Sequence, residues 1–339
     1  MDQFVQAFAS KQAFMGSVLI ARGNEVLLSK GYGFANLEWN MPNSPATKFT
    51  LASVTKQFTA AAILLLEERG KLKTSDPVKS LMPDAPPAWD HITIFHLLTH
   101  TSGIPNFTTF PDYLVQEALP ATPEKTVASF RDKPLDFKPG EKFNYSNSGY
   151  VLLGHLIEKI TGGSYEKFLQ ENIFTPLGMK DSGCDSDTAV IPRRAAEYIP
   201  GKQGPEHVGF FHMAFSAGGL YSTTEDLLRW EQGLFGGKLL STGSLAKMIS
   251  PANPEPFPNG DYWIKNYGYA MGVAPGTLSG HKLIQHGGGV GFGKPGLRAF
   301  VVYFPDDKLT VIVLANLDID SVERIARRLA ELALGGPGH

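Results

Sequence analysis

The sequence predicts an α+β protein in which both ends of the chain build a β-rich part and the middle forms a mostly helical insert. Strand-like runs separated by turn residues occur near each terminus, while apolar residues at helical spacing and several prolines dominate the middle. The 339 residues also exceed the roughly 250 to 300 at which a single core stops growing. We therefore predict two lobes, an α/β domain from residues 1–75 and 210–339 and a helical domain from residues 76–209.

The two chain ends carry similar hairpin signals. Near the N-terminus, Gly16–Arg22 and Glu25–Gly31 flank a Gly23-Asn24 turn. Near the other end, the turn Pro305-Asp306-Asp307 separates two further strand-like runs, which are Leu297–Phe304 and Leu309–Asn316. A run with helical spacing, Ser321–Leu334, follows them and stops at a pair of glycines.

Helical spacing marks the middle of the chain. Val151–Ile160 and Tyr165–Phe174 place apolar residues on one face, and Gly162-Gly163 separates the two helices. The segment Ser222-Thr223-Thr224-Glu225 has the pattern of a capping box, with Ser222 at the N-cap of a helix that begins where the chain returns to the α/β part.

Composition narrows the classes of partner. The formal net charge is −2 and the pI is about 6.5, so the chain as a whole has no strong attraction for nucleic acid or anionic lipid. The longest strongly apolar run, Ala60–Leu66, is far shorter than the about 18 residues of a membrane span. No secretory leader is visible, and the compartment stays open. We expect a small ester or peptide-like substrate, with no cofactor.

Serine and lysine recur three residues apart at Ser53/Lys56, Ser164/Lys167 and Ser244/Lys247. The second pair suits a helix cap and the third an exposed helix face. The first pair opens the segment that continues to Leu66, which is apolar nearly all round and therefore predicts a buried helix. Residues three apart share a helix face, so Lys56 would lie beside the Ser53 hydroxyl. The alternative is that Ser53 only caps the helix and Lys56 extends to solvent.

Tyr145-Ser146-Asn147 precedes a helix expected to begin near Gly149, so Tyr145 and Asn147 can project from a loop. A phenol has a pKa of about 10, but a cation about 4 Å away would lower that pKa by roughly three units and make it a usable base. Lys56 is the candidate cation. Taken alone, Tyr145 is as well explained by packing and Asn147 by a turn.

His286-Gly287-Gly288-Gly289 follows a strand-like run, Lys282–Gln285. Consecutive glycines let a strand edge approach a ligand and point backbone N–H groups at an oxyanion, and one such donor lowers a barrier by about 2.7 to 4 kcal/mol. The alternative is a glycine-rich turn with an incidental histidine.

Ser53-x-x-Lys56, Tyr145-x-Asn147 and His286-x-Gly288, in this order, resemble the serine β-lactamase and penicillin-binding-protein superfamily, in particular its class C-like branch. That branch includes family VIII esterases, D-aminopeptidases and D-alanyl-D-alanine carboxypeptidases. Further similar segments are residues 31–36, 96–103 and 216–222. The resemblance implies an antiparallel sheet flanked by helices, built from both chain ends beside a helical domain, with a cleft between them.

The resemblance also implies roles for these residues. Ser53 would be acylated, Lys56 and Tyr145 would handle its proton, and Asn147 would orient Lys56 and the substrate carbonyl. The amides of Ser53 and Gly289 would form the oxyanion hole, with substrate lying along Gly287, Gly288 and Gly289.

One departure concerns His286, because β-lactamases of this class usually have lysine there. A neutral imidazole binds a carboxylate less well. Lys294 or Arg298 could supply the missing cation, but the sequence does not place them. Histidine at this position resembles the esterase and D-aminopeptidase members of the superfamily, which favours esters or D-amino-acid amides as substrates. A class C-like β-lactamase and a non-catalytic penicillin or peptidoglycan sensor remain alternatives.

Two other site classes have weaker support. His-Gly-Gly-Gly also occurs in α/β-hydrolase lipases, but there it precedes a Gly-x-Ser-x-Gly motif, which this sequence lacks. His96 and His100 lie four apart on an expected helix and could bind a metal, although no zinc-protease pattern accompanies them. Structural histidines are the simpler explanation.

Overall fold

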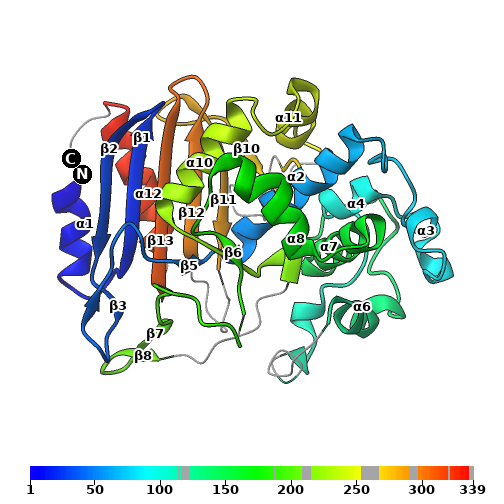
Figure 1. Cartoon of the computed structure of the whole chain (residues 1–339), viewed down its shortest axis with the longest axis horizontal. Helices are drawn as coiled ribbons and strands as arrows, with labels where there is room; N and C mark the ends of the chain where they lie inside the picture. Colours follow the sequence, from blue (N-terminus) through cyan, green and yellow to red (C-terminus); the bar gives the residue numbers. More distant parts are fainter. Residues whose placement is uncertain are drawn as a thin grey trace.

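The architecture is an antiparallel sheet with helices on both faces and a helix-rich region beside it, as a computed structural model shows (Figure 1). The structure describes residues 1–335 except 114, 116–121, 187, 208–214, 253–266, 290–296 and 320. Among these residues, no helix is long and apolar enough to cross a membrane.

Both chain ends enter the same sheet, because β1 near the N-terminus pairs antiparallel with β13 near the C-terminus. The main path runs β10-β11-β12-β13-β1-β2, and β7 joins it by parallel pairing with β13 and carries β8 at its side. The strands of this sheet are β1 (Gly16–Arg22), β2 (Glu25–Tyr32), β7 (Tyr198–Gly201), β8 (Gly204–His207), β10 (Gly272–Leu278), β11 (His281–Gly288), β12 (Leu297–Phe304) and β13 (Leu309–Ile319). The α+β fold expected from the sequence is confirmed.

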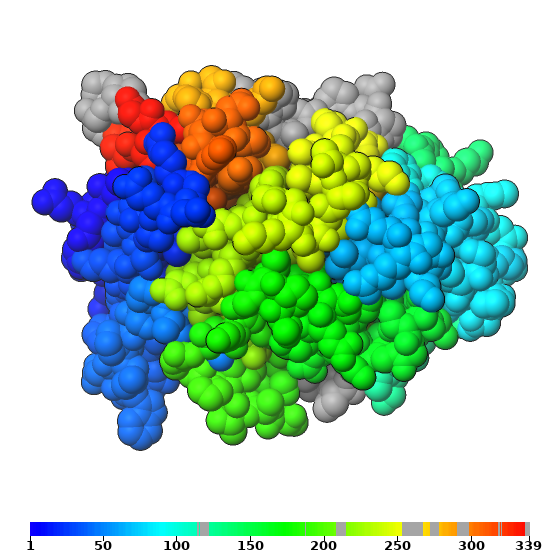
Figure 2. Space-filling model, turned by 45° about the horizontal axis from the view of Figure 1, so that its top comes forward, coloured from blue at the N-terminus to red at the C-terminus, as the bar shows by residue number. Residues whose placement is uncertain are grey.

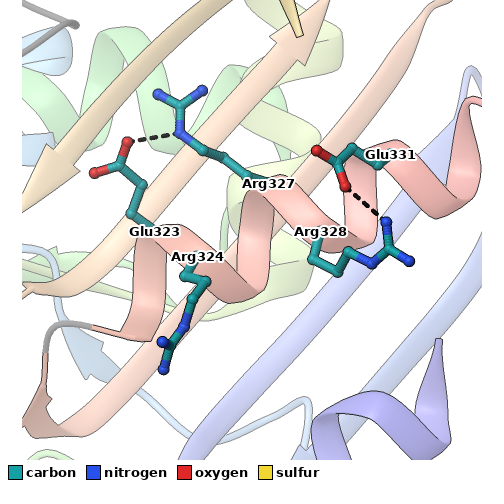
Figure 3. Close-up of a pocket in the computed structure, with 5 residues that line it drawn as sticks. All are labelled: Glu323, Arg324, Arg327, Arg328 and Glu331. Carbon is teal, nitrogen blue, oxygen red and sulfur yellow. Dashed lines mark hydrogen bonds and ion pairs between the residues drawn. The ribbon is translucent and has the colours of Figure 1, made fainter. Parts of the chain in front are cut away.

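Alternating residues of the strands face two different cores. Val18 and Ile20 of β1 pack with α1 (Asp2–Ala9) and α12 (Ser321–Ala333), whereas Leu19 and Ala21 face the opposite side. The N-terminal hairpin and the C-terminal strand pair occur where the sequence predicts them, since local alternation and turn residues are short-range signals. On α12, the surface turned away from the sheet carries charged side chains, including the pairs Arg327–Glu323 and Arg328–Glu331 (Figure 3).

The second face of the sheet packs against α10 and against helices from the middle of the chain in one continuous apolar cluster. The remaining α-helices are α2 (Thr55–Glu68), α3 (Val78–Leu81), α4 (Ile94–Leu98), α6 (Pro123–Arg131), α7 (Asn147–Thr161), α8 (Tyr165–Leu169), α9 (Thr175–Leu177), α10 (Thr224–Phe235) and α11 (Thr242–Ile249). On the face shown in Figure 2, the segment from α10 to α11 fills the surface between the sheet and the helical region.

Short elements complete the chain. Two small sheets consist of β3 (Phe34–Asn36) with β4 (Met41–Pro42), and of β5 (Phe49–Thr50), β9 (Leu220–Ser222) and β6 (Gly183–Cys184). The 3₁₀ turns are η1 (Ala52–Val54), η2 (Pro87–Trp89), η3 (Phe107–Thr109) and η5 (Phe215–Ala217). The two-lobe division stays a prediction, because the boundary expected near residue 210 lies outside the described residues.

Two expected helices differ in detail from the sequence pattern. Tyr165–Phe174 is not one α-helix but α8 followed by a π-helical turn, Gln170–Phe174, just before Pro176, which has no N–H to continue a regular ladder. The N-cap of α10 is Thr223, whose side chain accepts from the Asp226 amide, and not Ser222. Ser222 is instead held in β9 by pairing with Phe49.

Candidate active site

The serine and the lysine of the first Ser-x-x-Lys motif lie at the entrance of a helix buried in the core. Every residue of α2 from Thr55 to Leu66 is buried. The turn η1 precedes α2, and its first residue, Ala52, has a φ of 46° although it is not glycine. Such a left-handed residue costs about 1 to 3 kcal/mol and persists only where the surroundings hold it in place. Ser53 therefore stands on a constrained turn.

Ser53 does not serve as a helix cap. The N-cap of α2 is Val54, and no side chain accepts a hydrogen bond there. Lys56 is fully buried, so it does not extend to solvent either. Both parts of the alternative explanation for this motif are therefore wrong for the first pair, and the Ser53 hydroxyl is available to Lys56.

The Lys56 ammonium position has three hydrogen-bond partners. Nζ lies 3.0 Å from Ser53 Oγ, 2.8 Å from Asn147 Oδ1 and 2.7 Å from the Ala217 carbonyl oxygen. The side-chain nitrogen of Asn147, Nδ2, donates to Thr108 Oγ1 at 3.1 Å, and this bond turns Oδ1 toward Lys56. Residues from three distant parts of the sequence thus meet at one amine.

Burial determines the protonation state of this amine. Desolvation holds the pKa of Lys56 well below its ordinary value of 10.5, which favours neutral NH₂. A neutral amine has two N–H groups and one lone pair. Asn147 Oδ1 and the Ala217 carbonyl can only accept, so they take the two N–H groups. The lone pair is then left facing the Ser53 hydroxyl, which is the arrangement of a general base.

Tyr145 lies in the loop before α7 and contacts both residues of the pair. Its hydroxyl hydrogen-bonds the Ser53 side chain, and Lys56 Nζ lies 4.8 Å from the centre of its ring. The expectation that Lys56 lowers the pKa of Tyr145 toward neutrality is wrong. Burial raises that pKa, and the hydrogen bond with Ser53 offsets only part of the effect. Tyr145 is therefore a neutral phenol that can donate as well as accept.

Asn147 is the first residue of α7 and not a loop residue, because the helix begins two residues before the expected Gly149. Ser146 occupies the N-cap position without a side-chain cap bond. The Asn147 backbone N–H donates to Asn106 Oδ1 at 3.1 Å, so the nearby loop supplies the missing cap. This bond fixes the residue that orients Lys56.

The end of β11 packs against the serine turn. A Cβ added to Gly288 would lie 2.2 Å from the Leu51 carbonyl oxygen and 3.1 Å from the Ser53 nitrogen, so only glycine fits this close backbone approach. Gly287 pairs with Phe300 in β12, and Gly289 is the first residue after the strand. The oxyanion role of the Ser53 and Gly289 amides stays a prediction.

His286 is buried and neutral. Its Nε2 lies 2.9 Å from the Tyr267 hydroxyl and its Nδ1 lies 2.7 Å from the Gly287 carbonyl oxygen. Because a carbonyl can only accept, Nδ1 carries the hydrogen and Nε2 accepts from Tyr267. Burial lowers the pKa of His286 to about 3. This side chain is therefore not a cation at neutral pH.

Of the two cations suggested in place of His286, only Arg298 lies within the described residues. Arg298 is 1% exposed and forms an ion pair with Glu197, which also accepts from Thr50 Oγ1 at 2.7 Å. The suggestion is wrong for Arg298, because its guanidinium is held inside the protein. Lys294 lies outside the described residues.

The metal hypothesis for His96 and His100 is also wrong in its premise. Helix α4 ends at Leu98, so the two histidines do not share a helical face. His96 Nδ1 accepts from the Thr93 amide at 3.2 Å and completes a cap of α4. Within the described part of the chain, one group has ligand spacing: Glu124, His155 and Glu158 on α6 and α7. His155 Nδ1 lies 3.6 Å from a Glu124 carboxylate oxygen, and burial lowers the pKa of His155, so its ring stays uncharged at neutral pH.

Sequence reasoning missed three contributors to this site: the Ala217 carbonyl, Thr108 and Tyr267. In the sequence, the segment around Ala217 stands out only for its similarity to the superfamily. A backbone carbonyl acts regardless of its side chain, so no residue pattern marks it. Phe215, with a φ of 42°, shows that the turn η5 presenting this carbonyl is itself constrained.

Known proteins match this chain over its whole length. Residues 1–335 match the family described as Beta-lactamase. "Penicillin-binding protein 4*" of Bacillus subtilis (strain 168) is 30% identical, over 99% of this chain and 76% of that protein. "Putative penicillin-binding protein PbpX" of the same strain is 29% identical, over 93% of this chain and 74% of that protein.

Solved structures share the fold. The octameric penicillin-binding protein homologue from Pyrococcus abyssi is 33% identical with a TM-score of 0.85, covering 99% of this chain and 77% of that one. A D-stereospecific amidohydrolase from Streptomyces sp. is 24% identical with a TM-score of 0.80, covering 99% and 98%. The motifs, the fold and these matches lead to one conclusion: the chain belongs to the beta-lactamase family.

Proposed function

We propose that this protein is a serine hydrolase that forms a covalent acyl-enzyme on Ser53 and acts on small esters or D-amino-acid amides. The observation that carries the proposal is the set of contacts at Lys56, whose amine is buried, bonded to two obligate acceptors and 3.0 Å from Ser53 Oγ. In the pairs Ser164/Lys167 and Ser244/Lys247, the lysine lies beside an acidic side chain instead.

In the proposed first step, Ser53 Oγ attacks the substrate carbonyl carbon while its proton passes to the Lys56 amine, directly or through the Tyr145 hydroxyl. The carbonyl oxygen becomes an oxyanion facing the amides of Ser53 and Gly289. When the tetrahedral intermediate collapses, the bond to the leaving group breaks and the leaving group receives that proton. The phenol of Tyr145, kept neutral by burial, is suited to deliver it.

In the proposed second step, water attacks the acyl-enzyme and gives up a proton to the same two groups. The carbonyl carbon then releases Ser53, which regains its hydrogen. The free carboxylic acid is the product. No step requires a metal or a cofactor, because every proton transferred has a donor and an acceptor among these side chains.

The substrate class follows from the charge state at β11. His286 is neutral and hydrogen-bonded at both ring nitrogens, so it offers no cation to a substrate carboxylate. This favours neutral acyl groups over the carboxylate-bearing ring of β-lactams. A shared fold with the D-stereospecific amidohydrolase is consistent with amide substrates.

The experiment is a substrate panel of p-nitrophenyl acetate and butyrate, D-alanine p-nitroanilide and a chromogenic cephalosporin, run with the native protein, Ser53→Ala and Ser164→Ala. We expect the native protein to turn over the esters or the anilide. Ser53→Ala should lose this turnover completely, and Ser164→Ala should keep it at the native rate. A fluorophosphonate adduct mapped to Ser53 by mass spectrometry is the independent check. Turnover retained in Ser53→Ala would refute the nucleophile, and hydrolysis of only the cephalosporin would make the protein a β-lactamase.

A further inference from the structure

We propose that His100 is a positioning residue that holds the Tyr145 loop in place and ties it to the end of β11. This inference rests on the proposed function, because it concerns how the Tyr145 hydroxyl is kept beside Ser53. His100 does not touch the reacting atoms and acts only through its neighbours.

His100 contacts three consecutive residues of the loop. Its carbonyl oxygen accepts from the Asn144 amide at 2.8 Å, and its ring Nδ1 accepts from the Ser146 amide at 3.1 Å. Between them, the Tyr145 ring packs on the imidazole, with ring centres 4.3 Å apart and planes inclined by 31°. Any displacement of the Tyr145 backbone or rotation of its ring would therefore break at least one of these contacts.

The same imidazole reaches toward the strand on the other side of the site. The ring of Tyr267 lies 5.2 Å from that of His100, and Phe143 packs edge-on against both at 5.5 Å. Tyr267 donates to His286 Nε2, one residue before the glycines of β11. The contacts thus run from Tyr145 through His100 and Tyr267 to His286, which keeps the two sides of the site in a fixed relation.

The residue type fits this role better than it fits simple packing. His100 is 1% exposed and has a φ of 57°, a left-handed conformation that histidine adopts more readily than most side chains. Because Nδ1 accepts a hydrogen bond, Nε2 carries the hydrogen, and within the described residues it has no hydrogen-bond partner. A buried N–H without a partner is destabilising. Phenylalanine would avoid that cost but could not accept from Ser146, and asparagine could accept but could not stack on Tyr145.

A double-mutant cycle tests the proposal, with His100→Asn and Tyr145→Phe made singly and together and the rate of fluorophosphonate labelling of Ser53 as the readout. His100→Asn should slow labelling about 10- to 100-fold in the native background, since a misplacement of about 1 Å can cost that much. In the Tyr145→Phe background, His100→Asn should slow labelling about twofold or less, because the hydroxyl that His100 positions is absent.

Controls separate positioning from folding. His155→Asn removes another buried histidine, outside the site, and should leave labelling unchanged. His100→Phe keeps a ring stacked on Tyr145 but loses the Nδ1 acceptor for the Ser146 amide. This variant tests the positioning role if His100→Asn does not fold. Equal losses in both Tyr145 backgrounds, or native labelling by a folded His100 variant, would overturn the positioning role. Failure of the native protein to label at Ser53 would instead overturn the proposed function.

Discussion

The entrance of α2 and the entrance of α8 carry the same two residue types at the same spacing, in opposite surroundings. At α8, Ser164 is the N-cap and accepts from the Lys167 amide, while the exposed Lys167 amine lies 3.9 Å from Glu171. At α2, Ser53 caps nothing and Lys56 is fully buried among acceptors. The comparison teaches that the spacing alone does not decide what the two side chains do, and that burial and the other partners set the Ser53/Lys56 pair apart.

The third pair supports this lesson. At α11 the cap is Ser241, and the Lys247 amine binds Glu67 at 2.8 Å. A carboxylate partner stabilises the ammonium form, which has no lone pair and cannot act as a base. The hydrogen-bond partners of Lys56 among the described residues are neutral, so no carboxylate there offsets the cost of burying its charge.

The largest difference in activity between the two pairs is expected when Lys56→Met is compared with Lys167→Met. Losing the general base should lower kcat/KM for p-nitrophenyl acetate by about 10³-fold, within the usual range of about 10² to 10⁴. Methionine fills the buried space without a charge, so the fold should persist. Lys167→Met should change kcat/KM by about twofold at most, because its ion pair is exposed. Similar losses in both variants would contradict the distinction drawn here.

Tyr145→Phe should lower the acylation rate by about 10²-fold, because the phenol bonded to Ser53 can no longer relay a proton. Stopped-flow measurement of the nitrophenolate burst gives this rate. Tyr303→Phe is the matched control, since that ring stacks on Phe235 at 4.2 Å, away from the site. If Tyr145→Phe reacts at nearly the native rate, Lys56 alone is the base.

Gly288→Ala tests the contact between β11 and the serine turn. The added methyl would overlap the Leu51 carbonyl oxygen and push the strand away from Ser53, so we expect about a 10-fold or greater loss of acylation rate. At Gly163 an added Cβ meets only the flexible Lys167 side chain at 3.9 Å, so Gly163→Ala should react normally. Native rates in Gly288→Ala would show that the strand can shift without harm.

Glu231 of α10 tests whether burial alone shifts a pKa in this core. It is 2% exposed, and burial raises its pKa from 4.5 to about 8. The folded state then holds a proton that the unfolded chain releases above pH 4.5, so stability falls as the pH rises from 4.5 to about 8. Glu231→Gln should remove this slope and gain more than about 1 kcal/mol over the native protein at pH 8. Urea unfolding at several pH values measures it, and parallel pH profiles would contradict the shift.

The smallest effect concerns the ordinary cap of α8. Ser164→Ala should lower the free energy of unfolding by about 1 kcal/mol, because the Lys167 amide loses its acceptor. Ester turnover should stay at the native rate. Any loss of turnover in this variant, measured beside urea unfolding, would mean that the second serine–lysine pair is more than structural.

Local patterns predicted much of the fold. The hairpin β1–β2, the strands β12 and β13, and helix α12 occur close to their expected bounds. Alternation and turn residues act over a few positions, so a single stretch of sequence contains the information. The N-cap of α10, Thr223, lies one residue after the expected position, and α7 begins at Asn147, two residues before the expected start. Bonds to distant segments, to Phe49 and Asn106, decide these positions.

The sequence by itself determined which side chains are available for chemistry, namely Ser53, Lys56, Tyr145, Asn147 and the glycines after His286, and that α2 would be buried. Only the tertiary structure decided their protonation states and partners. Desolvation and the contacts with Ala217, Thr108 and Tyr267 arise when segments 161, 39 and 19 residues apart along the chain pack together. A pKa depends on everything that surrounds a group in space, and no stretch of sequence contains its own surroundings.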